Sequence, residues 1–291
     1  MRSAALLPLL IIGLMPACRG TAPGDDNPAD TDTDTDTDTD TDTDTDTDTD
    51  TDTDTDTGFD CDGGPTDTSF WGTLQASEVT TTNPYTNDAG IQAILDQAPA
   101  DGEDVTFDPP LQVTKAVVTV SNFVPEGIFP STFWFADKNA ALRTYDNREL
   151  EDDIVIPEEY TALPAGSVVS FSVSKLTNYA GELEIIGLDD FVIHDEATQP
   201  VYVVDATDGT KLTYADHGRQ VARIWARVAE VREPCGSASC YTLETNGNEY
   251  ALRIRKDYIV GDCLPVAAPV GQFAGELQFN ISDFDSVGGP F

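Results

Sequence analysis

The octapeptide NYAGELEI at residues 178–185 returns near the end of the chain as QFAGELQF at residues 272–279. Both copies contain the tetrapeptide Ala-Gly-Glu-Leu. A shared tetrapeptide can arise by chance, whereas a duplicated domain requires further matches in the same order around it. The segments that flank the two octapeptides meet this requirement.

Two more segments recur upstream of each octapeptide. The segment QVTKAVVTV at 112–120 is similar to QVARIWARV at 220–228, and Ala-Leu-Arg at 141–143 returns at 251–253. The offset between the two copies is 108 residues for the first segment, 110 for Ala-Leu-Arg and 94 for the octapeptide. The first copy therefore has about sixteen extra residues between Ala-Leu-Arg and the octapeptide. The sequence therefore predicts a duplicated domain with an Asp- and Glu-rich insertion at 145–163.

Both copies have the pattern of β structure. Val169, Phe171 and Val173 alternate with serines, a period of two that indicates a half-buried strand. Asn246-Gly247 lies between two such runs and predicts a tight hairpin. The best helical candidate is 89–97. Each copy contains a long strand, a hairpin, a connecting segment and a second hairpin turned at Ala-Gly, which makes five strands.

Five strands with a long first strand and a variable third connection are typical of the OB-fold barrel. We therefore predict an all-β chain with two tandem OB-fold-like barrels, at residues 71–199 and 200–291. The first copy resembles OB-fold modules of secreted bacterial lipoproteins and modules that accompany extracellular nucleases. The resemblance implies a binding or spacing module, with catalysis supplied by a separate domain that is not found in this sequence. The segments that carry it are 91–95, 102–106, 133–137, 163–168 and 179–181.

The N-terminus is typical of an exported protein. An apolar run of about a dozen residues follows Arg2, which is too short to span a membrane and suits a signal peptide at 1–17. The segment LMPAC, which ends at Cys18, resembles the lipobox of bacterial lipoproteins, in which the cysteine carries the lipid. Arg19 in the next position then implies the outer membrane, at the cell surface or on the periplasmic side. The alternative is a soluble secreted protein that loses Cys18 with its signal.

A low-complexity segment separates this anchor from the barrels. Residues 31–56 are thirteen Thr-Asp pairs, which offer no apolar side chain to bury and repel one another. We expect a disordered, extended stalk over residues 18–70. A spacer is its simplest function. A loose calcium-attracting polyanion and a glycosylated stalk are the alternatives.

The charge of the chain distinguishes among the partners it can attract. The chain carries a formal net charge of −38, and beyond Phe70 it still has 34 acidic and 13 basic residues. Residues up to 199 hold 22 of these acids and 5 bases, against 12 and 8 in the remainder. Because such a field repels phosphates, we do not expect nucleic acid as a partner. We expect attachment to the membrane through the lipid, and an unidentified protein or glycan as ligand.

No motif in the chain predicts catalysis, a cofactor or a metal site. His194 and His217 are the two histidines, and we expect both to be solvated. The chain has no Gly-x-Ser-x-Gly elbow and no glycine-rich phosphate loop. The prediction is a non-enzymatic, lipid-anchored surface protein with tandem OB-like interaction modules. The alternative is a calcium-dependent secreted hydrolase, or an accessory subunit of one, that uses the acidic insertion.

The cysteines suit an oxidising compartment. Cys235 and Cys240 flank a short connection between the first two strands of the second copy, where we expect a disulfide. Cys61 and Cys263 are then either paired with each other or free.

One basic and aromatic face emerges as a possible ligand surface. Arg223, Trp225 and Arg227 alternate on one strand, and Arg253 and Arg255 should point outward from another strand of the same barrel. OB-folds bind ligands on such a face with aromatic and basic groups. It could equally be an arginine row neutralised by neighbouring glutamates, or a contact with the acidic first barrel. Between a contact and a ligand surface, we favour the contact.

Overall fold

The repeated Ala-Gly forms the same tight turn in both halves of the computed structural model. Ala180 and Gly181 have φ of 53° and 90°, and Ala274 and Gly275 have φ of 51° and 86°. Two successive residues with positive φ define a type I′ hairpin turn, whose second position favours glycine. The structure describes residues 61, 78–122, 132–145, 153–154, 163–233 and 238–280. These residues all belong to one compact unit, Asp54–Phe291.

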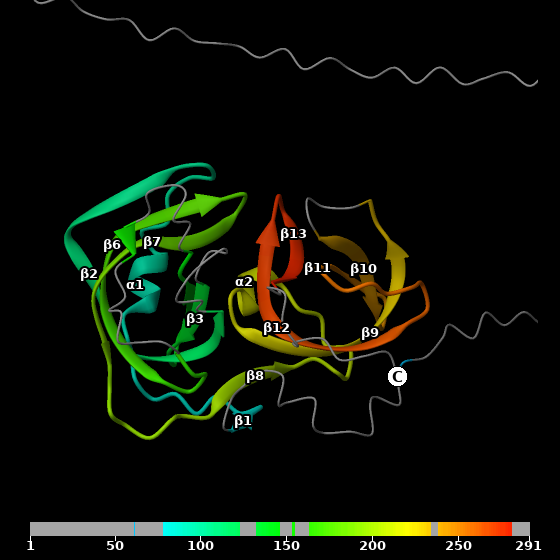
Figure 1. Ribbon diagram of the computed structural model, residues 1–291, viewed down its shortest axis with the longest axis horizontal. Coiled ribbons are helices and arrows are strands. Elements are labelled where there is room, and N and C mark those ends of the chain that lie inside the picture. Colours follow the sequence, from blue (N-terminus) through cyan, green and yellow to red (C-terminus); the bar gives the residue numbers. More distant parts are fainter. Residues whose placement is uncertain are drawn as a thin grey trace, which may run out of the picture. The chain divides into compact units, whose positions relative to one another are not determined.

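The first half forms an OB-like barrel (Figure 1). Its sheet has the order β4-β3-β2-β6-β7-β5, with the short β5 added in parallel beside β7. An isolated parallel bridge between Thr144, after β4, and Ile185 in β7 closes the barrel. The five barrel strands are β2 (Asp104–Asn122), β3 (Thr132–Ala136), β4 (Ala141–Arg143), β6 (Val168–Tyr179) and β7 (Glu182–Ile193), and β5 is Asp153–Ile154.

The second half forms a closed five-stranded barrel of the same topology. Strand β9 pairs with both β10 and β12, and β11 pairs in parallel with β13. Two short strands extend this sheet beyond β9, where β8 pairs with β9 and β1 pairs with β8. The strands are β1 (Val79–Thr80), β8 (Val201–Asp205), β9 (Val221–Val231), β10 (Ser239–Thr245), β11 (Asn248–Ile254), β12 (Cys263–Phe273) and β13 (Glu276–Asn280).

The predicted fold class is therefore confirmed. The repeated segments occupy equivalent places, because 112–120 and 220–228 run along the first strand of each barrel, and Ala-Leu-Arg lies in the third. The helix expected at 89–97 is present as α1 (Ile91–Leu95), and a second helix, α2 (Tyr214–His217), precedes β9. Most of the acidic insertion, the stalk and the signal peptide lie outside the described residues.

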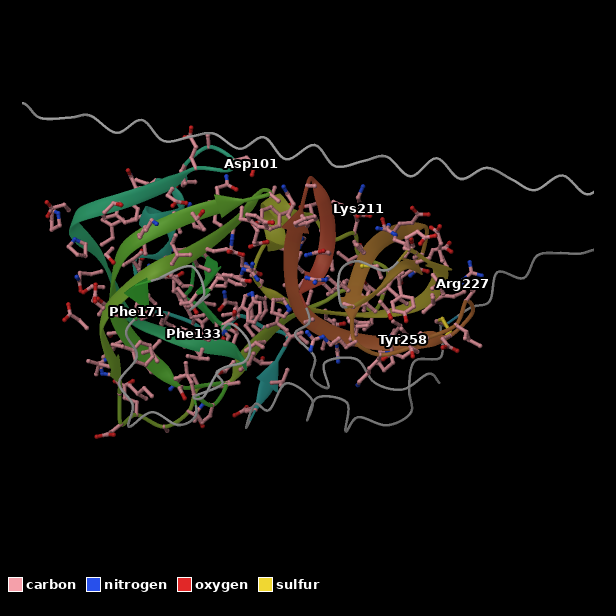
Figure 2. The ribbon with its side chains drawn as sticks, turned by 45° about the horizontal axis from the view of Figure 1, so that its top comes forward. Asp101, Phe133, Phe171, Lys211, Arg227 and Tyr258 are labelled. Atoms are coloured by element: carbon pink, nitrogen blue, oxygen red, sulfur yellow. A yellow bond between two sulfur atoms is a disulfide. The ribbon has the colours of Figure 1, made fainter. Side chains whose placement is uncertain are left out.

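Each barrel has its own apolar core. In the first, Phe133, Phe135, Phe171 and Phe191 form a cluster in which contacting rings have centroids 5.0–6.1 Å apart. Figure 2 labels two of them, Phe133 and Phe171. Helix α1 adds two fully buried isoleucines to this core. The second core takes alternate residues of β9, as the period of two predicts. A third, smaller cluster contains Ala165, Val201, Val203, Val221 and Ala267, which come from both halves.

Candidate ligand-binding site

The predicted arginine and tryptophan positions share the outer face of β9. Arg223, Trp225 and Arg227 are half-buried, while the residues between them are fully buried in the second core. Sequence periodicity therefore placed these side chains correctly on the strand. Trp225 pairs across the ladder with Pro265 of β12.

Both β9 arginines form ion pairs within the second half of the chain. Arg223 bonds Asp205 of β8, and this bond, together with weaker hydrogen bonds from Thr207, lowers the pKa of the Asp205 carboxyl to about 2. Arg227 donates to Glu244 of β10 at 2.6 Å. For Arg227, this contact agrees with the alternative in which neighbouring glutamates neutralise the row of arginines.

Arg253 and Arg255 are exposed, and they lie away from Arg227. Arg253 is opposite Cys240 on β10, whereas Arg227 is opposite Glu244. Four residues of a strand separate those two positions, a distance of roughly 13 Å. The structure thus divides the predicted face into two groups.

The disulfide pattern is partly resolved. Cys61 is bonded to Cys263, across 202 residues of sequence, which decides between the paired and free states left open above. Cys240 is also disulfide-bonded. Its predicted partner Cys235 lies outside the described residues, as does the predicted lipidation site Cys18.

The two repeated turns contact each other. The backbone N–H of Ala274 donates to the carbonyl of Ala180 at 2.8 Å. Tyr179 and Phe273, the aromatic residues that precede each Ala-Gly, have ring centroids 6.2 Å apart at an interplanar angle of 48°. The side chain of Gln272 packs on Gly181, where a β-carbon would come within 2.2 Å of its amide nitrogen. We call this contact between the turns the seam.

Buried charges lie behind the seam. Glu182 Oε1 is 3.4 Å from Arg219 Nε, and these side chains are 3% and 10% exposed. Glu182 also accepts a 2.7 Å hydrogen bond from the Gln272 backbone N–H. A second buried pair joins Arg143 of β4 to Glu184 of β7. Charges removed from water need such partners, so the seam requires these residues together.

Burial also shifts the titration of the neighbouring groups. It lowers the pKa of the Arg143 guanidinium, against the opposing attraction of Glu182. Burial likewise raises the pKa of the Tyr214 hydroxyl, and the negative charge of Glu182 adds to this effect. Arg219 lies over the Tyr214 ring, 4.7 Å from its centroid. The tyrosine therefore stays neutral and supports the guanidinium through its ring face.

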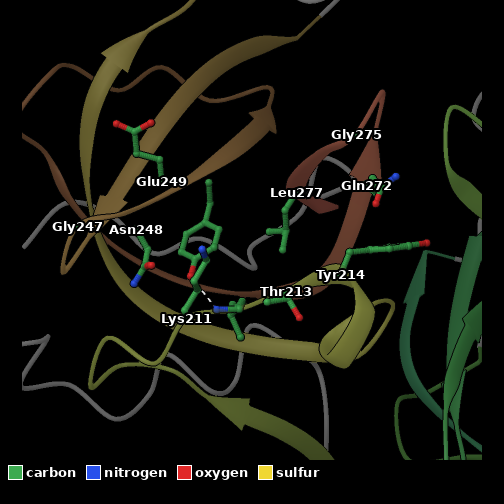
Figure 3. A pocket seen from close by; sticks show the side chains of 11 residues that line it. Lys211, Thr213, Tyr214, Gly247, Asn248, Glu249, Gln272, Gly275 and Leu277 are labelled. Carbon is green, nitrogen blue, oxygen red and sulfur yellow. Dashed lines mark hydrogen bonds between the residues drawn. The ribbon is translucent and has the colours of Figure 1, made fainter.

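A pocket of about 410 Å³ opens next to the seam at the end of the second barrel (Figure 3). The hairpin turns of β10–β11 and β12–β13 and the segment before β9 surround it. A hydrogen bond from the Leu212 N–H to the Tyr250 hydroxyl, 2.9 Å long, fixes one wall. The lining combines apolar, amide, hydroxyl and charged groups: Lys211, Leu212, Thr213, Tyr214, Gly247, Asn248, Glu249, Tyr250, Gln272, Gly275 and Leu277.

Sequence reasoning missed both the seam and the pocket. The available signal was the aromatic residue before Ala-Gly in each octapeptide, which a tight turn does not require. Sequence reasoning also treated His194 as solvated, whereas its Nε2 lies 2.8 Å from the Ser170 hydroxyl and its ring is half-buried. Within the described ranges, no cluster of three or more His, Cys, Asp or Glu could hold a metal, and no helix has the length and apolarity needed to cross a membrane.

Comparison with known proteins found similarity to solved structures. No family model and no curated protein matches the chain. A crystal structure of the p204 HINb domain is similar over 64% of this chain and 97% of its own, with 11% identity and a TM-score of 0.30. The structure of a murine DNA-binding protein bound to double-stranded DNA is similar over 62% of this chain and 98% of its own, with 10% identity and a TM-score of 0.30. The structure of the Ifi202 HINa domain in complex with a 20-base-pair DNA duplex is similar over 65% of this chain and 99% of its own, with 14% identity and a TM-score of 0.28.

These likenesses correct one prediction. We did not expect nucleic acid as a partner, and structures solved in complex with double-stranded DNA contradict that exclusion. The physical reason is that net charge sums over a whole domain, while OB-folds bind ligands on a local face. At these identities and TM-scores, the likenesses do not identify a ligand for this chain.

Proposed function

We propose that this chain is an exported, lipid-anchored, non-enzymatic binding protein whose two OB-like barrels act as one interaction module. The observation that carries the proposal is the pocket beside the seam. Its volume of about 410 Å³ lies within the range of roughly 300–1,000 Å³ typical of ligand sites. Polar and apolar groups both line it, which suits recognition of a small ligand or of part of a larger one.

The anchor in this proposal rests on sequence. The segment at 14–18 resembles a lipobox, and Thr-Asp pairs follow it. A lipidated Cys18 would hold the chain at the outer membrane, and an extended stalk would separate the barrels from the lipid surface.

The anchor is tested by mass spectrometry of the mature N-terminus together with membrane fractionation. We expect acyl chains on Cys18, and release of the Cys18→Ala protein from the membrane fraction. The matched control is Cys61→Ser, which removes a different cysteine and should stay in the membrane fraction. An unmodified N-terminus that begins downstream of Cys18 would contradict the anchor.

The absence of catalysis is tested separately on the purified full chain. Phosphodiester and glycoside substrates are offered with and without calcium, and we expect no turnover in either condition. Turnover that requires calcium and is lost in Asp152→Asn/Asp153→Asn would instead establish the hydrolase alternative. Those two residues belong to the acidic insertion that the alternative invokes.

A further inference from the structure

We infer that the pocket at the end of the second barrel binds a small amphiphilic anion, an apolar molecule that carries one carboxylate or phosphate group. The inference rests on the proposed function, in which this pocket is the ligand site, and names the class of its ligand. It is carried by an apolar floor, a lysine and two hydrogen-bond donors that surround the same space (Figure 3).

The floor of the pocket borders the second core. Leu212 and Tyr250 are buried members of this core, and Leu277 of β13 is half-buried and packs against it. The pairing of β12 with β13 places Leu277 opposite Gln272, so both side chains lie on the face that lines the pocket. An apolar ligand that covers Leu277 removes further surface from water, which favours binding.

Lys211 is the lining residue that attracts an anion. It is exposed, and among the described residues no carboxylate forms an ion pair with it. Three other lysines each pair with a carboxylate: Lys115 with Glu196, Lys138 with Asp88, and Lys175 with Asp104. In a chain with a large excess of acidic residues, this ammonium is left for a ligand.

Glu249, the acidic residue of the lining, faces away from the pocket. It is opposite Glu244 on β10, and Glu244 bonds Arg227 on the outer face of the barrel. Side chains alternate along a strand, and the next residue of β11, Tyr250, is buried in the core. Figure 3 shows the Glu249 side chain turned away from Lys211. Among the residues that line it, the pocket therefore presents one cation and no anion to a ligand.

Hydrogen-bond donors complement this lysine. The Tyr250 hydroxyl accepts the 2.9 Å bond from the backbone N–H of Leu212, so its own hydrogen can be donated to a ligand. Leu212 follows Lys211, so the bond places the hydroxyl next to the segment that carries the ammonium. Gln272 adds an amide donor from β12. These groups match a carboxylate or phosphate, whose ionised oxygens accept hydrogen bonds.

The acidic excess of the chain does not cancel this local charge. Carboxylates next to the lining already have partners, because Asp216 accepts from Thr213 at 2.7 Å and Glu182 lies 3.4 Å from Arg219. Salt at 0.1 M screens exposed charges that lie more than about 10 Å away. A ligand small enough to enter the pocket therefore responds to Lys211 more than to the net charge of the chain.

The test is isothermal titration calorimetry of the purified full chain in detergent, with a detergent blank. The probes are phenylacetate and phenyl phosphate, which share an apolar ring and differ in the anionic group, together with neutral phenylacetamide and inorganic phosphate. We expect saturable binding of at least one ring-bearing anion, and the comparison of the two distinguishes carboxylate from phosphate. Phenylacetamide lacks the charge and inorganic phosphate lacks the apolar body, so each should bind at least about 10-fold more weakly.

Variants at the lysine test the role of its charge. Lys211→Gln changes an exposed group and should leave the melting temperature unchanged. It should weaken binding of the anion about 10-fold and binding of phenylacetamide by less than about 2-fold. Lys211→Arg keeps the charge and should bind within about 3-fold of wild type. The matched control, Lys175→Gln, removes a lysine of the first barrel and should bind as wild type does.

The outcomes separate the class of ligand from the pocket itself. Anion binding that Lys211→Gln leaves unchanged, or equal binding of phenylacetate and phenylacetamide, would overturn the anion assignment. Leu277→Ala trims the floor and should weaken the ring-bearing anion and the amide alike; if it does so while the two bind equally, the pocket stands as a ligand site and only the ligand class fails. Wild type that binds neither ring-bearing anion would overturn the inference. None of these outcomes alters the mass of the N-terminus, so the anchor is judged independently.

Discussion

Glu182 and Glu276 occupy the same position of the repeated Ala-Gly-Glu-Leu, and their substitution should have very different effects. Glu182 is buried against Arg219, and its side chain is 3% exposed. Glu276 forms a two-bond pair with Arg232 at 2.6 and 2.9 Å, and its side chain is 51% exposed. The two glutamates therefore compare a buried ion pair with an exposed one in the same local sequence.

The expected magnitudes follow from solvation. Glu182→Ala leaves the Arg219 guanidinium buried without its partner, which should cost about 3–5 kcal/mol of unfolding free energy. Glu276→Ala breaks a pair that water already screens and should cost about 0–1 kcal/mol. For a chain of this size, each kcal/mol lowers the melting temperature by roughly 2–4 °C. The melting temperature should therefore fall by roughly 6–20 °C in Glu182→Ala and by at most about 4 °C in Glu276→Ala.

The assay is urea unfolding of both variants, monitored by circular dichroism. Their unfolding free energies are compared provided that the dependence of free energy on urea concentration has the same slope in both. A third variant, Glu182→Leu/Arg219→Met, removes both buried charges. It should recover most of the lost stability, because apolar residues of similar volume can replace a buried pair. Equal losses for Glu182→Ala and Glu276→Ala, or no recovery in the double variant, would refute this account of the seam.

Three further results are expected. Because Arg223 lowers the Asp205 pKa to about 2 from the usual 3.8, this pair stabilises the fold above about pH 4 and stops doing so as pH falls toward 2. The Asp205→Asn variant should be about 1 kcal/mol less stable than wild type at neutral pH, after allowance for solvent screening. Between about pH 4 and 2, acid unfolding should show that the variant loses less unfolding free energy than wild type does. Gly166→Ala brings a β-carbon within 2.5 Å of a backbone oxygen at φ 90°, so it should destabilise more in thermal melts than Gly102→Ala, which has positive φ but open space. Cys61→Ser opens a very long covalent loop and should lower the unfolding free energy by up to about 5 kcal/mol, as measured against wild type under oxidising conditions.

Sequence predicted the parts of the structure that depend on local pattern. The period of two in β6 and β9, the Asn-Gly and Ala-Gly turns and the duplicated order of segments together specified ten barrel strands and their OB-like topology. Each of these features is determined by residues close together in the chain, and the duplication presented each one twice. Agreement between the copies supplied information that a single barrel would lack.

The candidate site depends on contacts that local pattern does not contain. The bond from Gln272 to Glu182 joins residues 90 positions apart, and identical tetrapeptides place one glutamate in the interior and the other at the surface. Periodicity likewise put the arginines on outer faces, but it did not give the register between strands. That register places Arg253 opposite Cys240 and away from Arg227.

The bond between Cys61 and Cys263 has a topological consequence. Residues 62–262, which include the whole first barrel, lie within a covalently closed ring. A protease that cuts the backbone once anywhere in this ring, the acidic insertion included, produces two fragments that remain joined. Tension applied to the chain before Cys61 passes directly into β12, so the first barrel carries none of it. Whatever is attached at the N-terminus is therefore held covalently by the second barrel, and the first barrel can be nicked or pulled open without detaching the protein.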